Sequence, residues 1–159
     1  MGDIHRETVE RYLNMAEQAY ILYRADRYDP AGTSLQPNPK YYSVDQGLRN
    51  MSLGFDLSDI GRILENIVYL ELIRRGHKIT IGKWNSKEID FVTNMPDGNR
   101  QYIQVCYDIN SEGTMERELS PLREVKDSFK KLVIAMMPPG SYFTNDGIEI
   151  KNILEWLLE

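Results

Sequence analysis

Two short runs in the second half of the chain have the pattern of a β-hairpin. Polar and apolar residues alternate over residues 88–92, which predicts a strand with one buried face. A Pro-Asp-Gly-Asn turn segment follows, and residues 102–107 then alternate again. Asp90 and Gln104 share a face of this hairpin only if the loop between the strands holds an odd number of residues, as a three-residue loop with a bulge would.

Helical and strand patterns on both sides of the hairpin indicate an α/β fold. Residues 57–75 have the apolar spacing of a helix, with Arg74 and Arg75 before the stop at Gly76. The other expected elements are a strand over 77–84, a charged helix over 112–129 broken at Pro121, a fully buried strand over 131–136, an edge strand over 147–150 and a closing helix over 153–157. We therefore predict a mixed central β-sheet flanked by helices.

The first 44 residues differ in pattern from the rest and are expected to form a separate helix-strand segment, with an α/β domain over residues 45–159. Residues 8–20 have helical periodicity, residues 21–23 read as a short strand, 31–39 as a loop and 41–44 as a strand. This order suggests part of a winged-helix-like unit, or a helix that packs on the main body. Acidic residues on the helix, such as Glu10 and Glu17, argue against a role as a DNA recognition helix.

Composition narrows the class of protein without identifying it. A length of 159 residues fits one domain with a small appendage, and a net charge of -5 gives no general attraction for nucleic acid. Cys106 is the single cysteine, which excludes an internal disulfide and fits a reducing compartment. No apolar run reaches the roughly 20 residues of a membrane span. His5 and His77 have no zinc-site spacing. We expect a cytoplasmic protein with no membrane association.

Acidic and amide side chains occur at three positions where a metal site is conceivable. Glu65 borders the apolar stripe of the helix over 57–75, so this carboxylate needs a partner or a ligand. Asp90 and Gln104 lie on neighbouring strands of the hairpin. Carboxylate and carbonyl oxygens are the ligands that Mg²⁺ prefers, and such a cation stabilises charge on a phosphate.

The element order with Glu65, Asp90 and Gln104-Val105-Cys106 resembles the PD-(D/E)xK, or restriction-endonuclease-like, superfamily of metal-dependent nucleases. More narrowly, the chain resembles the C-terminal domain of uncharacterised prokaryotic AAA-type ATP-binding proteins, from Glu7 to Leu158. The runs that carry this likeness are Glu7-Thr-Val-Glu-Arg-Tyr-Leu13, Asn38-Pro-Lys-Tyr-Tyr42, Asp45-Gln-Gly-Leu-Arg49, the segment from Gly61 to Glu71, Lys87-Glu-Ile-Asp-Phe91 and Tyr102-Ile-Gln-Val-Cys106.

The resemblance implies a catalytic and metal-binding set with two departures from the superfamily pattern. Glu65 and Asp90 match acidic positions, whereas Gln104 stands in place of the second strand acid and is a weaker, neutral ligand. Cys106 stands where the superfamily has its catalytic lysine and cannot supply a fixed positive charge. Lys87 and Arg117 are candidate replacements for that charge. The resemblance implies Mg²⁺ as the cation where a site survives.

Three functions follow from this pattern. The favoured hypothesis is a degenerate nuclease-like module that binds nucleic acid or a partner for an attached ATPase. The alternatives are an active metal-dependent nuclease and a structural or oligomerisation domain of the ATPase. The sequence has no Walker A motif, so no ATPase activity is expected from this chain, and the resemblance implies an N-terminal ATPase region in a longer parent protein.

Simpler interpretations of the same residues stay open. Glu65 would pair with an arginine such as Arg62 or Arg117. Glu88 and Asp90 would form a polar strand face that points to solvent. Cys106 would be a small packing residue, because no histidine is placed to activate its thiol.

Overall fold

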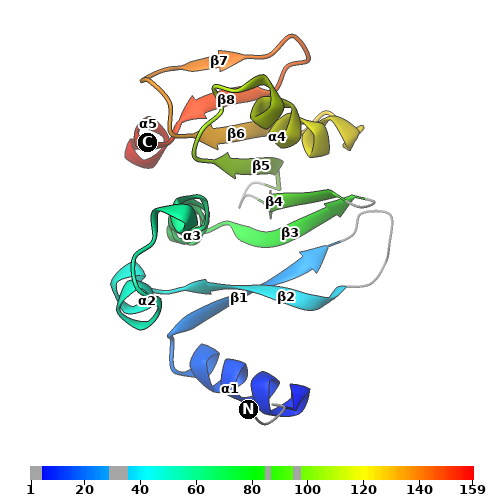
Figure 1. The fold of residues 1–159 in the computed structure, drawn as a ribbon. Helices are drawn as coiled ribbons and strands as arrows, with labels where there is room; N and C mark the ends of the chain where they lie inside the picture. Colours follow the sequence, from blue (N-terminus) through cyan, green and yellow to red (C-terminus); the bar gives the residue numbers. More distant parts are fainter. Residues whose placement is uncertain (1–4, 29–35, 85–86, 95–97) are drawn as a thin grey trace.

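The computed structural model describes residues 5–28, 36–84, 87–94 and 98–159. Within these residues one eight-stranded mixed sheet has helices on both faces (Figure 1), which confirms the predicted architecture. The helices are α1 (Arg6–Gln18), α2 (Gln46–Leu53), the 3-10 helix η1 (Leu57–Asp59), α3 (Ile60–Arg74), α4 (Glu112–Glu124) and α5 (Ile153–Leu158). The strands are β1 (Leu22–Tyr28), β2 (Gln36–Ser43), β3 (Lys78–Trp84), β4 (Lys87–Asn94), β5 (Arg100–Cys106), β6 (Lys130–Ala135), β7 (Ser141–Phe143) and β8 (Glu149–Asn152).

The strands lie in the order β2-β1-β3-β4-β5-β6-β8-β7. Antiparallel pairing joins β3, β4 and β5, whereas β1 with β3, β5 with β6, and β6 with β8 are parallel. The edge strand predicted over 147–150 is wrong, because β8 lies between β6 and β7 and is largely buried. The true edge is β7, whose three exposed residues are too few to give a periodic signal.

Two layers of apolar side chains hold the helices on the sheet. On one face, Val68 and Leu72 of α3 and Trp156 of α5 pack against residues such as Phe91. On the opposite face, Leu119 and Leu122 of α4 form a second core. The polar residues of the candidate site lie between these layers, where β4 and β5 separate.

Helix α4 is shorter than predicted and is not broken by its proline. It runs without interruption from Glu112 to Glu124 with Pro121 inside it. Pro121 removes one backbone donor, which would bond the carbonyl of Arg117, and the loss falls in the last turn of the helix. The buried proline also contributes to the packed side of the helix.

The N-terminal part contains two strands that are longer than the sequence pattern predicts and one helix that the pattern does not predict. The strand expected over 21–23 extends to Tyr28, and β2 covers residues 36–39, which were expected in a loop; the rest of that loop, 31–35, lies outside the described residues. β2 is an edge strand, which tolerates a proline such as Pro39. Helix α2 follows, and no residue of it is buried, so it lacks the apolar stripe by which helices are found.

The predicted turn chemistry is confirmed where the structure describes it. The pairing of Asn94 with Arg100 leaves five positions in the β4–β5 loop, an odd number; residues 95–97 of that loop are outside the described part. Gly98 has a φ of 87°, which suits glycine. Gly76 ends α3 with a φ of 79°, as the sequence predicts. Among the described residues, no helix combines the length and apolar character needed to cross a membrane.

Candidate functional site

The candidate site forms where strands β4 and β5 separate. The backbone ladder between them runs from Asn94 back to Phe91 and ends there. Beyond that point side chains replace the ladder: the backbone N–H of Asp90 donates to Oε1 of Gln104 at 2.7 Å, and the backbone N–H of Val105 donates to Oδ2 of Asp90 at 2.9 Å. Asp90 and Gln104 therefore face each other, as the odd loop predicts, and they bridge the gap between the two backbones.

A register shift in β4 sets the direction of the Asp90 side chain. Val92 pairs with Thr80 and Ile89 with Gly82, so β4 contains one more residue than β3 between these two pairs. Ile89 and Phe91 consequently belong to the cores on opposite faces, and both are fully buried. The prediction of one buried face for this strand is wrong, because a one-residue bulge reverses the alternation.

Lys40 brings a positive charge to the acids. From β2 its Nζ lies 2.9 Å from Oε1 of Glu65, 2.5 Å from Oε1 of Glu88 and 4.0 Å from Oδ1 of Asp90. We call these four residues the Lys40 cluster. Its carboxylates come from α3 and from two positions of β4, so three elements far apart in sequence meet on one ammonium group.

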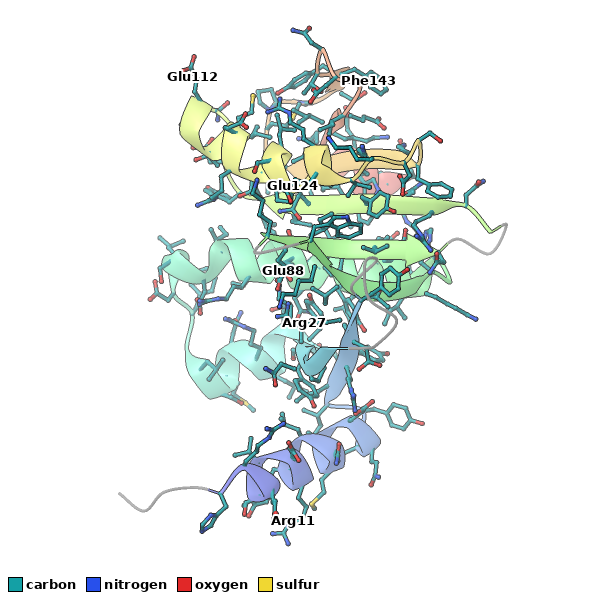
Figure 2. All side chains as sticks on the ribbon, turned by 90° about the vertical axis from the view of Figure 1, so that its right-hand side faces the viewer. Arg11, Arg27, Glu88, Glu112, Glu124 and Phe143 are labelled. Atoms are coloured by element: carbon teal, nitrogen blue, oxygen red, sulfur yellow. The ribbon has the colours of Figure 1, made fainter. Side chains whose placement is uncertain are left out.

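Two further side chains complete the hydrogen bonding of the cluster. The Tyr42 hydroxyl donates to Oε1 of Glu65 at 2.6 Å, and it lies two residues from Lys40 on the same strand. The Arg27 guanidinium pairs with Oε2 of Glu88, and Figure 2 labels this pair at the centre of the sheet. Each carboxylate of the cluster therefore has partners from the protein itself, which is what partly buried charges require.

Burial and mutual charge shift the ionisation of the cluster in different directions. Burial opposes the charge of Lys40, but the surrounding carboxylates outweigh it and hold the lysine pKa above its usual value. Burial also acts against Glu88, yet its bonds to Lys40 and Arg27 lower the pKa of that carboxyl. Asp90 is the exception: burial first, then repulsion from Glu65, raises its pKa to about 8.

Behind the cluster, Gln104 is held by a second polar chain. Its Nε2 donates to Oε2 of the buried Glu118 at 3.0 Å, and Arg117 donates to the other oxygen of Glu118 at 2.9 Å and 3.0 Å. Both ends of the Gln104 amide are therefore engaged. The amide is required here, because a carboxylate would face Glu118 with no proton to donate.

A cavity opens on each side of the Lys40 cluster. The first has a volume of about 260 Å³ and is lined by Lys40, Tyr41, Tyr42, Arg49, Arg62, Glu65 and Asn66. The second, of about 360 Å³, is lined by Lys87, Glu88, Asp90, Gln104, Arg117, Glu118, Ser120 and Pro121. Residues of the cluster thus line two cavities, and each cavity is large enough for a small chemical group or a single side chain of a partner.

The structure brings together three of the residues selected from the sequence, whereas Cys106 and Lys87 take no part in the Lys40 cluster. Glu65, Asp90 and Gln104 meet at the gap between β4 and β5. Cys106 is a buried free thiol, and burial raises its pKa to about 12, so it is no nucleophile at neutral pH. Lys87 lines the second cavity but pairs with Glu124 of α4 at 2.7 Å.

The simpler interpretations of the acids are corrected by these contacts. Glu65 pairs with Lys40 instead of an arginine: Arg62 binds Asp59 at 2.6 Å, and Arg117 binds Glu118. Glu88 and Asp90 do not form a strand face open to solvent, since both take part in the Lys40 cluster.

Lys40 is the residue of the site that the sequence interpretation missed. It falls between the predicted loop over 31–39 and the predicted strand over 41–44, so it belonged to no element. A usable signal was present, because Lys40 and Tyr42 stand two residues apart and therefore on one face of an extended strand. A lysine on the same strand face as a buried tyrosine needs an acidic partner.

A divalent cation does not fit the arrangement of these side chains. The Lys40 ammonium lies against the oxygens that would bind it, and the Gln104 carbonyl accepts the Asp90 N–H. Among the described residues, no three His, Cys, Asp or Glu side chains are grouped so that they could hold a metal ion. The roles in metal binding and catalysis expected for Glu65, Asp90 and Gln104 stay predictions.

Comparison with known proteins gives relatives without an established activity. Residues 1–59 match the model of a family described as a domain of unknown function, DUF8612. An "Uncharacterized protein" of Haemophilus influenzae is 39% identical over 156 residues, which are 96% of this chain and 37% of that protein. "Uncharacterized protein MJ1544" of Methanocaldococcus jannaschii is 35% identical over 129 residues, 78% of this chain and 28% of that protein. The chain thus spans less than two fifths of these relatives, and no solved structure matches it.

Proposed function

We propose that this chain is a restriction-endonuclease-like domain that does not cleave nucleic acid and instead binds a partner within a longer, ATPase-containing protein. The proposed core is supported by the order α3, β3, β4, β5, α4, β6 and by the meeting of Glu65, Asp90 and Gln104 at one point. The longer protein is supported by the length of the relatives, which extend well beyond the matched region.

The position of Lys40 carries the proposal that cleavage is lost. Its ammonium lies 2.9 Å from Glu65 and 4.0 Å from Asp90, the two acids on which a nuclease of this type would hold its cation. An internal ammonium balances the same charges without a metal, but it is no Lewis acid and activates no water. With Gln104 engaged by Asp90 and Glu118, the site lacks the donor set for metal-dependent hydrolysis.

A protein partner is favoured over nucleic acid by the charge of the chain. The net charge is -5, so the chain as a whole has no electrostatic attraction for a phosphate backbone. A cytoplasmic location belongs to the same proposal and is supported by the unpaired thiol of Cys106, which fits a reducing compartment.

A metal titration with the wild-type chain and Lys40→Ala tests this proposal. Wild type is expected to gain no thermal stability from Mg²⁺ or Mn²⁺ and to leave single- and double-stranded DNA intact. Lys40→Ala removes the ammonium from Glu65, Glu88 and Asp90, and a stabilisation by Mn²⁺ that wild type lacks would show that Lys40 stands in the place of a cation. Lys40→Ala combined with Asp90→Asn is the matched control and should lose that stabilisation.

Two outcomes would assign one of the other functions. Metal-dependent cleavage by wild type that Glu65→Gln abolishes would make the chain an active nuclease, with Lys40 supplying the positive charge that Cys106 cannot. Self-association of a chain that ignores metal, nucleic acid and protein partners would favour a structural or oligomerisation domain.

A further inference from the structure

The first third of the chain exposes an unusual share of its apolar side chains. Of sixteen large apolar side chains that are exposed among the described residues, ten lie before residue 60 and six after it. In the same described region before residue 60, Ala25 and Tyr42 are the only buried apolar residues. An exposed apolar concentration of this kind marks an interaction surface.

Six of these side chains define what we call the N-terminal apolar surface. They are Tyr12 and Met15 of α1, and Met51, Leu53, Phe55 and Leu57 in and after α2, all between 56% and 80% exposed. In Figures 1 and 2 α1 lies at the end of the molecule opposite β7, with α2 the helix nearest to it. Neither helix contains a buried residue.

The segment around α2 is fixed in place although it buries nothing. The Asp45 carboxylate accepts from the backbone N–H of Leu48 at 2.8 Å and caps the start of the helix, and Gly54 ends it with a φ of 79°. Arg49 pairs with Asp59 at 2.8 Å and ties the helix to the segment that follows it. The α2 part of the surface is therefore preformed, which lowers the entropy lost on binding.

Helix α1 has few of the tertiary contacts that stabilise a helix of its length, since none of its residues is buried. Isolated helices shorter than about 12–15 residues are marginal in water, and α1 has 13 residues. It touches the sheet at β1 through half-buried residues such as Leu13 and Ala16, while Tyr12 and Met15 remain open to solvent. A second apolar surface on its free side would supply the missing packing.

The relatives indicate what covers this surface. The matched region is 37% of the H. influenzae protein and 28% of the M. jannaschii protein, so 63% and 72% of those chains lie outside it. The family model covers residues 1–59, which contain the whole N-terminal apolar surface and end just after Leu57. We propose that this surface is the docking site for the polypeptide that the longer relatives carry outside the matched region.

This inference rests on the proposed function, because both give the chain a binding role, but the two fail separately. Cleavage by wild type would overturn the proposed function and leave the docking site untouched. The inference on docking fails only if the N-terminal apolar surface stays uncovered in the longer protein or is covered by a second copy of this chain.

Hydrogen exchange on two proteins tests the docking site. The probes are the backbone amides of α1 and α2 in this 159-residue chain and of the equivalent helices in the full-length H. influenzae relative. We expect fast exchange in the chain and exchange slower by at least about tenfold in the relative, because covered helices open less often. Amides of β5 and β6 provide the internal reference and should differ little. Equal exchange of both helices in the two proteins would overturn the proposal.

Sedimentation of the 159-residue chain excludes the other occupant. The chain should sediment as a monomer at micromolar concentration, as expected for a surface whose partner is absent. A dimer that Met51→Glu dissociates, but that Phe143→Glu on the far edge strand does not, would assign the surface to a second copy and refute the inference.

Discussion

The charged groups of the Lys40 cluster have partners within the chain, whereas the side chains of the N-terminal apolar surface are exposed to solvent. Every carboxylate of the cluster has a protein partner, and the lysine side chain is 27% exposed between them. The side chains of the apolar surface are left open to solvent: Met51 is 80% exposed and Leu57 70%. A set of groups that is satisfied internally has little left to offer a ligand, whereas an exposed apolar surface gains free energy when it is covered.

This difference shifts the expected function away from the acids. In a nuclease the acidic site would be the unsatisfied part, open to a cation and a phosphate. Here the acids surround an ammonium group, and the unsatisfied part lies on α1 and around α2. The molecule combines a polar centre that stabilises the fold with an apolar end that is suited to assembly.

The largest effect is expected when the cluster loses its ammonium. Lys40→Met leaves Glu65 with the Tyr42 hydroxyl alone and Glu88 with Arg27 alone, and breaking a buried pair in this way costs about 3 kcal/mol of unfolding free energy. Urea denaturation at pH 7 measures the loss. In the double variant Lys40→Met with Glu65→Gln the cost should be smaller than the sum of the single changes. A loss below about 0.5 kcal/mol, the range of surface substitutions, would mean that the cluster does not hold the fold together.

A somewhat smaller loss is expected from placing an acid at position 104, as the proposed nuclease pattern would have it. Gln104→Glu replaces the amide that donates to Glu118 by a second carboxylate, and leaving a buried group without its partner costs about 2 kcal/mol. Gln104→Met, which lacks the charge but also the donor, is the control. A fully stable Gln104→Glu would argue that the site still accommodates the nuclease pattern.

Parts of this site followed from the sequence because they depend on local patterns. Asp90 and Gln104 face each other because alternation and an odd loop length fix the parity of a hairpin. Glu65 stood out because a carboxylate beside an apolar helix stripe needs a partner. These three positions meet in the structure, and their roles in metal binding and catalysis stay predictions.

Lys40 and the bulge at β4 could not be found in that way. Lys40 meets Glu65 only because β1 pairs with β3 in parallel and so brings β2 next to the core, a contact between segments far apart in sequence. The extra residue between Ile89 and Val92 breaks the period on which the strand prediction relied. Helix α2 was missed because none of its residues is buried, so its sequence has no apolar stripe that would face a core.

The pH dependence of stability should report on Asp90. Its pKa is about 8 in the folded protein and near the ordinary aspartate value when unfolded, so the folded state binds this proton more tightly. Stability should therefore fall as pH rises from about 4 to 8. Asp90→Asn removes this slope and should stabilise the fold by about 1 kcal/mol at pH 8.

Thermal unfolding of wild type and Asp90→Asn between pH 5 and pH 9 checks this expectation. Glu88 contributes at lower pH, because its lowered pKa gives stability that is lost only as the pH falls through that value. Lys40 contributes at higher pH, because its raised pKa gives stability that is lost only under alkaline conditions. Parallel curves for the two proteins would show that Asp90 is ionised throughout and that its charge is compensated by Lys40.

The smallest effect on stability is expected at the apolar surface. Met51 is 80% exposed and belongs to a helix without buried residues, so Met51→Glu should change the unfolding free energy by less than about 0.5 kcal/mol. Equilibrium denaturation gives this number, and binding of an apolar fluorescent dye to the native chain gives the second readout. The dye signal should drop in Met51→Glu while the fold is unchanged.

Val68→Ala, a truncation in the core under α3, is the contrasting control and should cost at least about 1 kcal/mol. If Met51→Glu destabilised the chain as much as the core change does, Met51 would be contributing to the fold, and the contrast between a satisfied centre and an unsatisfied end would fail.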